Sequence, residues 1–245
     1  MSGVTTPHDY RALMESVPGL TVVGGQAVNL WAITYCSEDD VLPAHGSHDL
    51  DVVAKGAVAK AISQLPDWNY KKTPLWSFDI RTAELTCKTE DGTLLAVEIL
   101  NRVNGLDQKD LAATRTIEVG KAKFTVLDPI AMLKAKAANV RDLPQDGEPP
   151  RQDRQHLKII SICLPRFLED AHSTCAKDEK LHEEMSKLMK RCFEMLFDKK
   201  NIKTLKACGI TPSALIPDFS SSPIAAVKAS FDNQFSRLKA AEAQV

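Results

Sequence analysis

Two aspartates, Asp49 and Asp51, stand two residues apart in the run Ser47-His48-Asp49-Leu50-Asp51-Val52-Val53. In a strand, residues i and i+2 project from the same face, so both carboxylates would point one way while Leu50 and Val52 enter a core. Two carboxylates held together repel each other unless a cation lies between them, and oxygen ligands of this kind suit a hard metal ion. The pair therefore predicts a magnesium site, although such a tripeptide alone is more often a solvated strand end or turn.

A third acid and a glycine pair strengthen this hypothesis. Glu98 lies in the otherwise apolar run Leu94–Leu100, where an unpaired buried charge would be costly, so it either joins the metal pair or faces solvent on a half-exposed sheet. Gly24-Gly25 stands between a predicted strand and a predicted helix. Glycines let a phosphate approach the backbone, and a helix N-terminus offers free N–H groups, but a plain tight turn has the same appearance. The pair matches neither common nucleotide-binding glycine motif.

The elements that must position these residues follow from hydrophobic periodicity and turn signals. We expect helices over residues 7–17, Gln26–Tyr35, Gly56–Leu65 and Ile130 to about Arg141, the last capped by Asp128 with Pro129 at its first position. We expect strands over Leu20–Val23, Asp49–Ala54, Ser77–Lys88, Thr93–Arg102 and Ala122–Val126, with Asp91-Gly92 turning an antiparallel hairpin.

The segment Asp142–Pro150 holds three prolines and one glycine, so we expect a domain boundary there, with domains at 1–145 and 146–245. Beyond it the period is helical throughout, over Asp153–Asp170, Ser173–Asp198 and Ala225–Ala243. The predicted fold class is α+β, with a mixed β-sheet flanked by helices followed by a helical C-terminal domain.

Composition limits the function classes. The chain has 245 residues, of which 44% are hydrophobic and 26% charged, as is ordinary for a globular protein. Its 31 Lys and Arg nearly balance 32 Asp and Glu, so nucleic-acid binding would need a local basic patch. Six cysteines without CxxC spacing argue against a zinc site and favour reduced thiols. Without a signal-like N-terminus or a long apolar run, we expect a cytoplasmic protein with no membrane partner.

At this point the residues resemble a known family. The run Val22-Val23-Gly24-Gly25-Gln26-Ala27-Val28-Asn29-Leu30, followed by Ser47-His48-Asp49-Leu50-Asp51, is similar to the DNA polymerase beta-type nucleotidyltransferase superfamily. Its nearest branch by this resemblance contains the abortive-infection nucleotidyltransferase toxins of type IV toxin-antitoxin systems. The resemblance continues through Val126-Leu127-Asp128-Pro129, Leu133-Lys134 and Asp153, and covers roughly residues 20 to 165. Three positions depart from the family pattern: Glu98, Gln26 and His45.

The resemblance implies that residues 1–145 form a nucleotidyltransferase catalytic domain. Asp49, Asp51 and Glu98 would hold two magnesium ions, and Gly24, Gly25 and Ser47 would bind the nucleoside triphosphate. Glu98 would hold the metal that activates the acceptor hydroxyl or accept the proton of that hydroxyl. Lys134 would neutralise phosphate charge, with Lys136 as its competitor, and Asp153 would stand beside the site, unless each is only a solvated lysine or a helix cap. The acceptor implied by the toxins is an RNA 3' end such as that of tRNA, and an antitoxin protein is the implied partner.

Three readings stay open from the sequence. The enzyme transfers a nucleotidyl group to RNA; it transfers one to a small molecule or a protein; or catalysis is lost and a nucleotide-binding module remains, as the departures at Glu98 and Gln26 suggest. The stretch Lys177–Lys206 contains nine basic and six acidic residues and could give a basic face for RNA, although alternating charge on a helix is more often a solvated surface.

Overall fold

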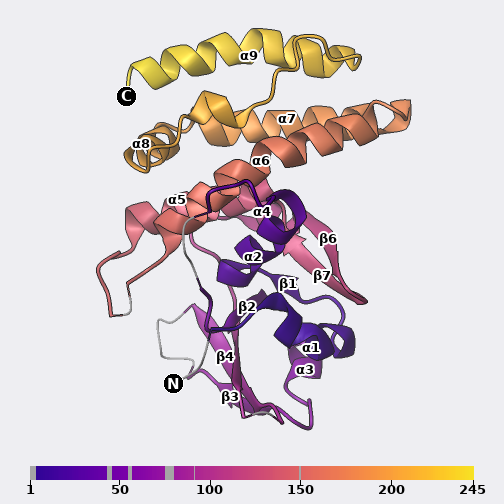
Figure 1. Cartoon of the computed structure of the whole chain (residues 1–245), viewed down its shortest axis with the longest axis vertical. Helices are drawn as coiled ribbons and strands as arrows, with labels where there is room; N and C mark the ends of the chain where they lie inside the picture. The colour runs from indigo at the N-terminus through magenta and orange to yellow at the C-terminus, as the bar shows by residue number, and fades with distance from the viewer. Residues whose placement is uncertain (1–3, 43–45, 55–56, 75–79, 91, 149) are drawn as a thin grey trace. The chain divides into compact units, whose positions relative to one another are not determined.

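The computed structural model describes residues 4–42, 46–54, 57–74, 80–90, 92–148 and 150–245 (Figure 1). The chain forms two compact units, Met1–Thr34 with Ala44–Met132 and Tyr35–Pro43 with Leu133–Val245. The division after Met132 falls inside a helix, whereas the domain boundary predicted between 145 and 146 lies further along, in the segment after that helix. Each unit is described by itself.

The first unit contains a seven-stranded mixed sheet with the strand order β3-β4-β5-β2-β1-β7-β6. Its strands are β1 (Thr21–Val22), β2 (Leu50–Val53), β3 (Asn69–Lys72), β4 (Arg81–Lys88), β5 (Leu94–Leu100), β6 (Thr114–Val119) and β7 (Ala122–Leu127). β1 runs parallel to β7 and β2 parallel to β5, while the other neighbours are antiparallel. The predicted mixed sheet and the β4–β5 hairpin are confirmed. Asp91 and residues 77–79, which the predictions also used, lie outside the described residues.

Four helices belong mainly to this unit: α1 (Arg11–Ser16), which follows a 3-10 turn at Pro7–Tyr10, α2 (Gly24–Tyr35), α3 (Ala57–Ile62) and α4 (Gln108–Ala112). α1 packs against β7. α2 buries Ala27, Leu30 and Trp31, and the indole Nε1 of Trp31 donates a hydrogen bond to the carbonyl oxygen of Leu127 at 2.8 Å. This bond ties the helix after β1 to the end of β7.

The second unit is helical, with α5 (Pro129–Asp142), most of which it contains, α6 (Asp153–Cys175), α7 (His182–Phe197), α8 (Lys199–Ala207) and α9 (Ala225–Ala243). The predicted Asp128 cap is confirmed, because its Oδ1 accepts a hydrogen bond from the backbone N–H of Ala131 at 2.9 Å. The single helix predicted over residues 173–198 is wrong: α6 ends at Cys175, and Asp178 caps a separate turn before α7 by accepting the N–H of Lys180. No helix of the described ranges has the length and apolar character needed to cross a membrane.

Candidate functional site

The turn between β1 and α2 places a glycine directly against an acidic side chain. Gly24 has φ +68°, a backbone conformation that glycine adopts without strain, and a Cβ built on it would overlap the carboxylate of Asp51. The backbone supports this approach, because the N–H of Val23 donates to the carbonyl oxygen of Asp51 at 2.9 Å. Both the conformation and the space at position 24 therefore require glycine.

Asp51 belongs to a row of acids that crosses three neighbouring strands. In the parallel β2–β5 pair Asp51 stands opposite Glu98, and in the antiparallel β4–β5 pair Glu98 stands opposite Glu84. Leu50 and Val52 are fully buried on the other face, while the three acids are only half-buried. The sheet register thus brings Asp51 and Glu98 side by side, as the metal hypothesis requires.

Asp49 lies just outside the strand predicted to contain it, because β2 begins at Leu50. Its charge nevertheless acts on both Glu98 and Tyr10, where it adds to the rise in pKa that burial causes in each group. Asp49 is therefore close to the acidic row. It lies in the loop before β2, whereas the prediction put it within the strand, two residues before Asp51.

Glu98 has a cationic partner that sequence reasoning missed. Arg81 Nη1 lies 2.9 Å from Glu98 Oε1, and the two side chains are 42% and 25% exposed. Burial raises the pKa of Glu98; the Arg81 ion pair opposes that rise, and the charges of Asp49 and Glu84 add to it. Arg81 begins β4 at a register irregularity between Arg81 and Ala83, so no local sequence pattern places it against Glu98.

The donor set fits a hard cation only in part. Carboxylate oxygens are the ligands magnesium uses, and Asp51 lies against a glycine turn with room for no side chain. Within the part of the chain that the structure describes, however, no three His, Cys, Asp or Glu side chains are grouped closely enough to hold a metal ion. The pairing of Glu98 with Arg81 gives a physical reason. Of the three predicted metal ligands, Glu98 is therefore engaged by Arg81, and the prediction for Asp49 and Asp51 remains a hypothesis.

A buried polar network fixes the loop before β2. The Ser47 hydroxyl donates to the Asp49 carbonyl at 2.9 Å, and the Ser47 carbonyl accepts from the backbone N–H of Thr5 at 2.7 Å. Gln26 is fully buried, and its Nε2 donates to both the carbonyl and the hydroxyl of Thr5 at 3.0 Å. The Thr5 hydroxyl is also 3.1 Å from that of Tyr10, whose pKa burial raises to about 12.

In this network two residues of the family-like runs, Ser47 and Gln26, have structural roles. Ser47 orients the loop that carries Asp49, and Gln26 holds the first turn of α2 to Thr5. The departure from the family pattern at Gln26 thus has a packing explanation within this chain. His45, the other departure near the motif, lies outside the described residues.

The remaining two predicted residues belong to the second unit. Lys134 is half-buried on α5. Asp153, at the start of α6, accepts hydrogen bonds from Lys136 at 3.0 Å, from Asn139 at 3.1 Å and from Arg151 at 2.8 Å. Both members of the Lys136–Asp153 pair are almost fully buried, so this ion pair joins the two helices. Burial raises the pKa of Asp153, but these partners outweigh it and hold the pKa at about 2.

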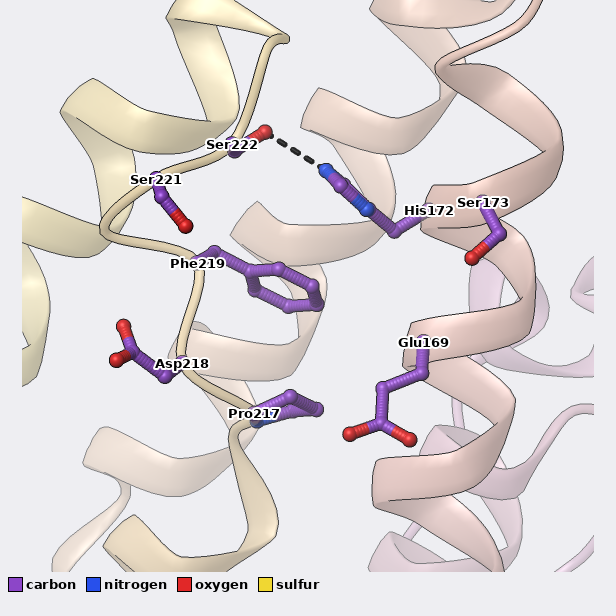
Figure 2. A pocket seen from close by; sticks show the side chains of 8 residues that line it. All are labelled: Glu169, His172, Ser173, Pro217, Asp218, Phe219, Ser221 and Ser222. Carbon is purple, nitrogen blue, oxygen red and sulfur yellow. Dashed lines mark hydrogen bonds between the residues drawn. The ribbon is translucent and has the colours of Figure 1, made fainter.

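A pocket of about 210 Å³ lies in the second unit, between α6 and the segment before α9 (Figure 2). His172 Nε2 is 2.7 Å from the Ser222 hydroxyl, and the His172 and Phe219 rings are 4.8 Å apart. The lining residues include the carboxylates of Glu169 and Asp218 but neither Lys nor Arg, so the pocket does not suit a phosphate.

No protein-family model and no curated protein matches the chain. Among solved structures, an antigenic nucleotidyltransferase-like protein from Paracoccidioides brasiliensis is 16% identical, with 66% of this chain and 78% of that chain covered and a TM-score of 0.42. JHP933 from Helicobacter pylori is 14% identical, with 97% and 95% covered and a TM-score of 0.35. Because both TM-scores are below 0.5, a function has to be argued from the residues of this chain.

Proposed function

We propose that this protein is a magnesium-dependent nucleotidyltransferase, which moves a nucleotidyl group from a nucleoside triphosphate to an acceptor hydroxyl, in the first instance the 3' end of an RNA such as tRNA. The observation that carries the proposal is the position of the Asp51 carboxylate against Gly24, at the N-terminal turn of α2. A carboxylate able to hold a cation and a helix N-terminus able to bind phosphate oxygens are thereby placed in contact.

In the proposed reaction each residue has a separate task. The N–H groups at Gly24-Gly25 bind phosphate oxygens of the triphosphate, and the Ser47 hydroxyl fixes the loop that carries Asp49. Asp49 and Asp51 would hold magnesium, which when bound supplies positive charge to the attacking and leaving oxygens. The acceptor oxygen forms a bond to the α-phosphorus, the bond to the β-phosphate bridging oxygen breaks, and pyrophosphate leaves.

Glu98 is the proposed acceptor for the proton of the attacking hydroxyl. Its burial raises its pKa, which makes the carboxylate a better base, and its register position opposite Asp51 supports this role. For this role the Arg81 ion pair must open or share the carboxylate. In the second unit, Asp153 would act by fixing α5 to α6 through Lys136.

The test uses each radiolabelled nucleoside triphosphate in turn, with magnesium, purified protein and total RNA. We expect label on RNA as a one-nucleotide extension, lost on chelation of the metal and reduced at least about 100-fold in Asp51→Asn, because a metal-holding charge is removed. Glu84→Gln is the matched control, since Glu84 lies in the same acidic row on β4 and should keep activity. Activity that survives Asp51→Asn would show that the site assignment is wrong.

One observation favours a second function. Because Glu98 forms an ion pair with Arg81, the chain could bind a nucleoside triphosphate at Gly24-Gly25 without transferring its nucleotidyl group. Binding of nucleotide, measured by calorimetry, without any transfer to RNA, to a small hydroxylated molecule or to protein would support this nucleotide-binding module. Label on a small molecule or protein instead of RNA would keep the chemistry and change the acceptor.

A toxin role is an extension of the same proposal. Adding a nucleotide to a tRNA 3' end would block its use, so expression should arrest growth and Asp51→Asn should relieve the arrest. A protein that restores growth when it is expressed with the active form, and binds it, would be the antitoxin partner.

A further inference from the structure

The exposed face of α8 carries four positive charges on nine residues. The exposed residues of α8 are four lysines and Ala207, and the residues between them on the buried face include Ile202 and Leu205. The four exposed lysines are Lys199, Lys200, Lys203 and Lys206. The helix itself contains no acidic residue; Asp198, which precedes it, caps it by accepting the N–H groups of Lys200 and Asn201.

This arrangement works against the stability of the helix. Lys199 and Lys203 are four residues apart, Lys203 is three residues from both Lys200 and Lys206, and like charges at these spacings repel. Lys199 and Lys200 also lie in the first turn, where the helix dipole disfavours positive charge. A surface selected only for solubility has no reason to concentrate charge in this way.

The neighbouring helices show the ordinary alternative. On α7, Lys187 pairs with Glu183 at 2.7 Å, and on α9, Lys228 pairs with Asp232 at 2.6 Å, both with i, i+4 spacing. None of the α8 lysines forms an ion pair with a carboxylate among the described residues; Lys206 donates instead to the backbone carbonyl of Glu242. Across residues 177–206, the lysines of α7 therefore include ion-paired ones, whereas those of α8 form no ion pair with a described carboxylate.

Two cationic residues of α6 lie near the end of α8. Arg154 and Lys158 are both exposed and one helical turn apart. Burial raises the pKa of the Cys208 thiol, and the charges of Arg154 and Lys158 oppose that rise, which places both near the end of α8. We define the α8 basic patch as these two residues and the four lysines.

We propose that the α8 basic patch binds the phosphodiester backbone of an RNA strand. Among the described residues no carboxylate forms an ion pair with any of these six cations, so they offer phosphates strong, sequence-independent attraction, as nucleic-acid backbones require. An anionic membrane surface fits less well, because Ile202 and Leu205 are buried and the apolar residue of α8 that is exposed with the lysines, Ala207, has only a methyl group to offer a bilayer. The inference deepens the proposed function by giving the RNA acceptor a binding surface, and it rests on that function for its biological meaning.

The experiment measures binding of a labelled single-stranded RNA of about 20 nucleotides to the full chain by fluorescence anisotropy, with EDTA and without triphosphate, from 50 to 300 mM salt. The variant replaces the four α8 lysines by glutamine, which keeps helix propensity similar. The control replaces four lysines at the same cost in net charge, Lys177, Lys180, Lys187 and Lys190. If all four α8 lysines contact phosphates, the slope of log affinity against log salt should fall by about 3 in the α8 variant, and affinity at 0.1 M salt by a few hundred-fold.

The control should bind within about threefold of the wild type, and the melting temperature of the α8 variant should be unchanged or higher, because repulsion is removed. Equal loss in both variants would overturn the proposal, since net charge alone would then explain binding. RNA binding that is unaffected by the α8 substitutions would also overturn the proposal. The same holds if those substitutions abolish binding to phosphatidylserine vesicles but leave RNA binding unchanged.

Failure of the two proposals can be told apart. Asp51→Asn should bind RNA as the wild type does, because its carboxylate takes no part in the patch. Binding that depends on the patch, in a protein that transfers no nucleotide, would overturn the proposed reaction and leave the surface in place. Transfer to RNA that is unchanged in the α8 variant, at RNA concentrations below the dissociation constant, would overturn the surface alone.

Discussion

Gly24→Ala tests the contact on which the proposed function depends. The chain offers a matched control in Gly209, which has φ +74° against +68° for Gly24 but nothing within 4 Å of an added Cβ. Placing alanine in this conformation costs about 1–2 kcal/mol, partly offset by about 0.4–1 kcal/mol from the stiffer unfolded chain. Gly209→Ala should therefore lower the free energy of unfolding by roughly 1 kcal/mol.

Gly24→Ala carries the same backbone strain and must also displace the Asp51 carboxylate. Overpacking of this kind adds about 1–3 kcal/mol, so the total should be roughly 2–4 kcal/mol. Urea unfolding followed by circular dichroism measures both variants, together with Asp51→Ala and the Gly24→Ala/Asp51→Ala double variant. Because Asp51→Ala removes the carboxyl atoms, which overlap most with the added Cβ, and leaves only the Cβ of residue 51 at 2.8 Å, the double variant should be more stable than the sum of the single effects predicts, by about 1–2 kcal/mol.

Two outcomes would refute this reasoning. Equal costs at Gly24 and Gly209 would mean that no carboxylate lies against the α2 turn. Additive effects of Gly24→Ala and Asp51→Ala would mean that the two positions do not touch. Either result would also remove the observation that carries the nucleotidyltransferase proposal.

Three further predictions concern the ion pairs. Asp153→Leu should lower the free energy of unfolding at pH 7 by roughly 3–5 kcal/mol, because Lys136 stays buried without its carboxylate partner. In urea unfolding, the Lys136→Met/Asp153→Leu double variant should recover most of this loss. A double variant as unstable as Asp153→Leu would contradict the ion pair as the cause. Since the pKa of Asp153 is depressed from 3.8 to about 2, its stabilisation is complete above pH 4 and lost as pH falls through 2, so the wild type should lose about 2 kcal/mol relative to the double variant over that range. Arg81→Met should raise the pKa of Glu98 further, because Arg81 opposes the effect of burial on that pKa. NMR titration of the Glu98 carboxyl carbon measures the change, with Arg115→Met as the control. An unchanged or lower pKa would show that the Arg81–Glu98 pair does not form in solution.

Local patterns predicted what depends on neighbouring residues. The glycine turn, the apolar alternation around Asp51 and the Asp128 cap are each set within a few residues, and the structure has β1, α2, β2 and the start of α5 close to where these signals indicate them. The position of Asp49 before β2 was missed because the loop is fixed by Thr5, far away in sequence.

What the sequence could not provide is set by pairing between distant segments. The neighbourhood of Asp51 and Glu98 depends on β2 joining β5 in parallel, and that of Glu98 and Arg81 on an irregular register. Lys134 and Lys136 are equivalent by local pattern, and only the packing of α6 selects Lys136 as the partner of Asp153. The strands β3 and β6 escaped prediction because Asn69–Lys72 and Thr114–Val119 have little apolar character.

The register of the acidic row limits how this chain can change its length. Side chains alternate between the two faces of the sheet. After deletion of one residue of β5 between Leu94 and Glu98, the chain could keep either the register of β5 with β2 or the turn that joins β5 to β4, but not both. If the turn were kept, Glu98 would exchange places with an apolar neighbour and enter the core. Deleting two residues would restore the face, although not the alignment with Asp51. In deletion scanning, losses of one and two residues in β5 should therefore differ in kind, the first unfolding the sheet and the second preserving it while separating the acids.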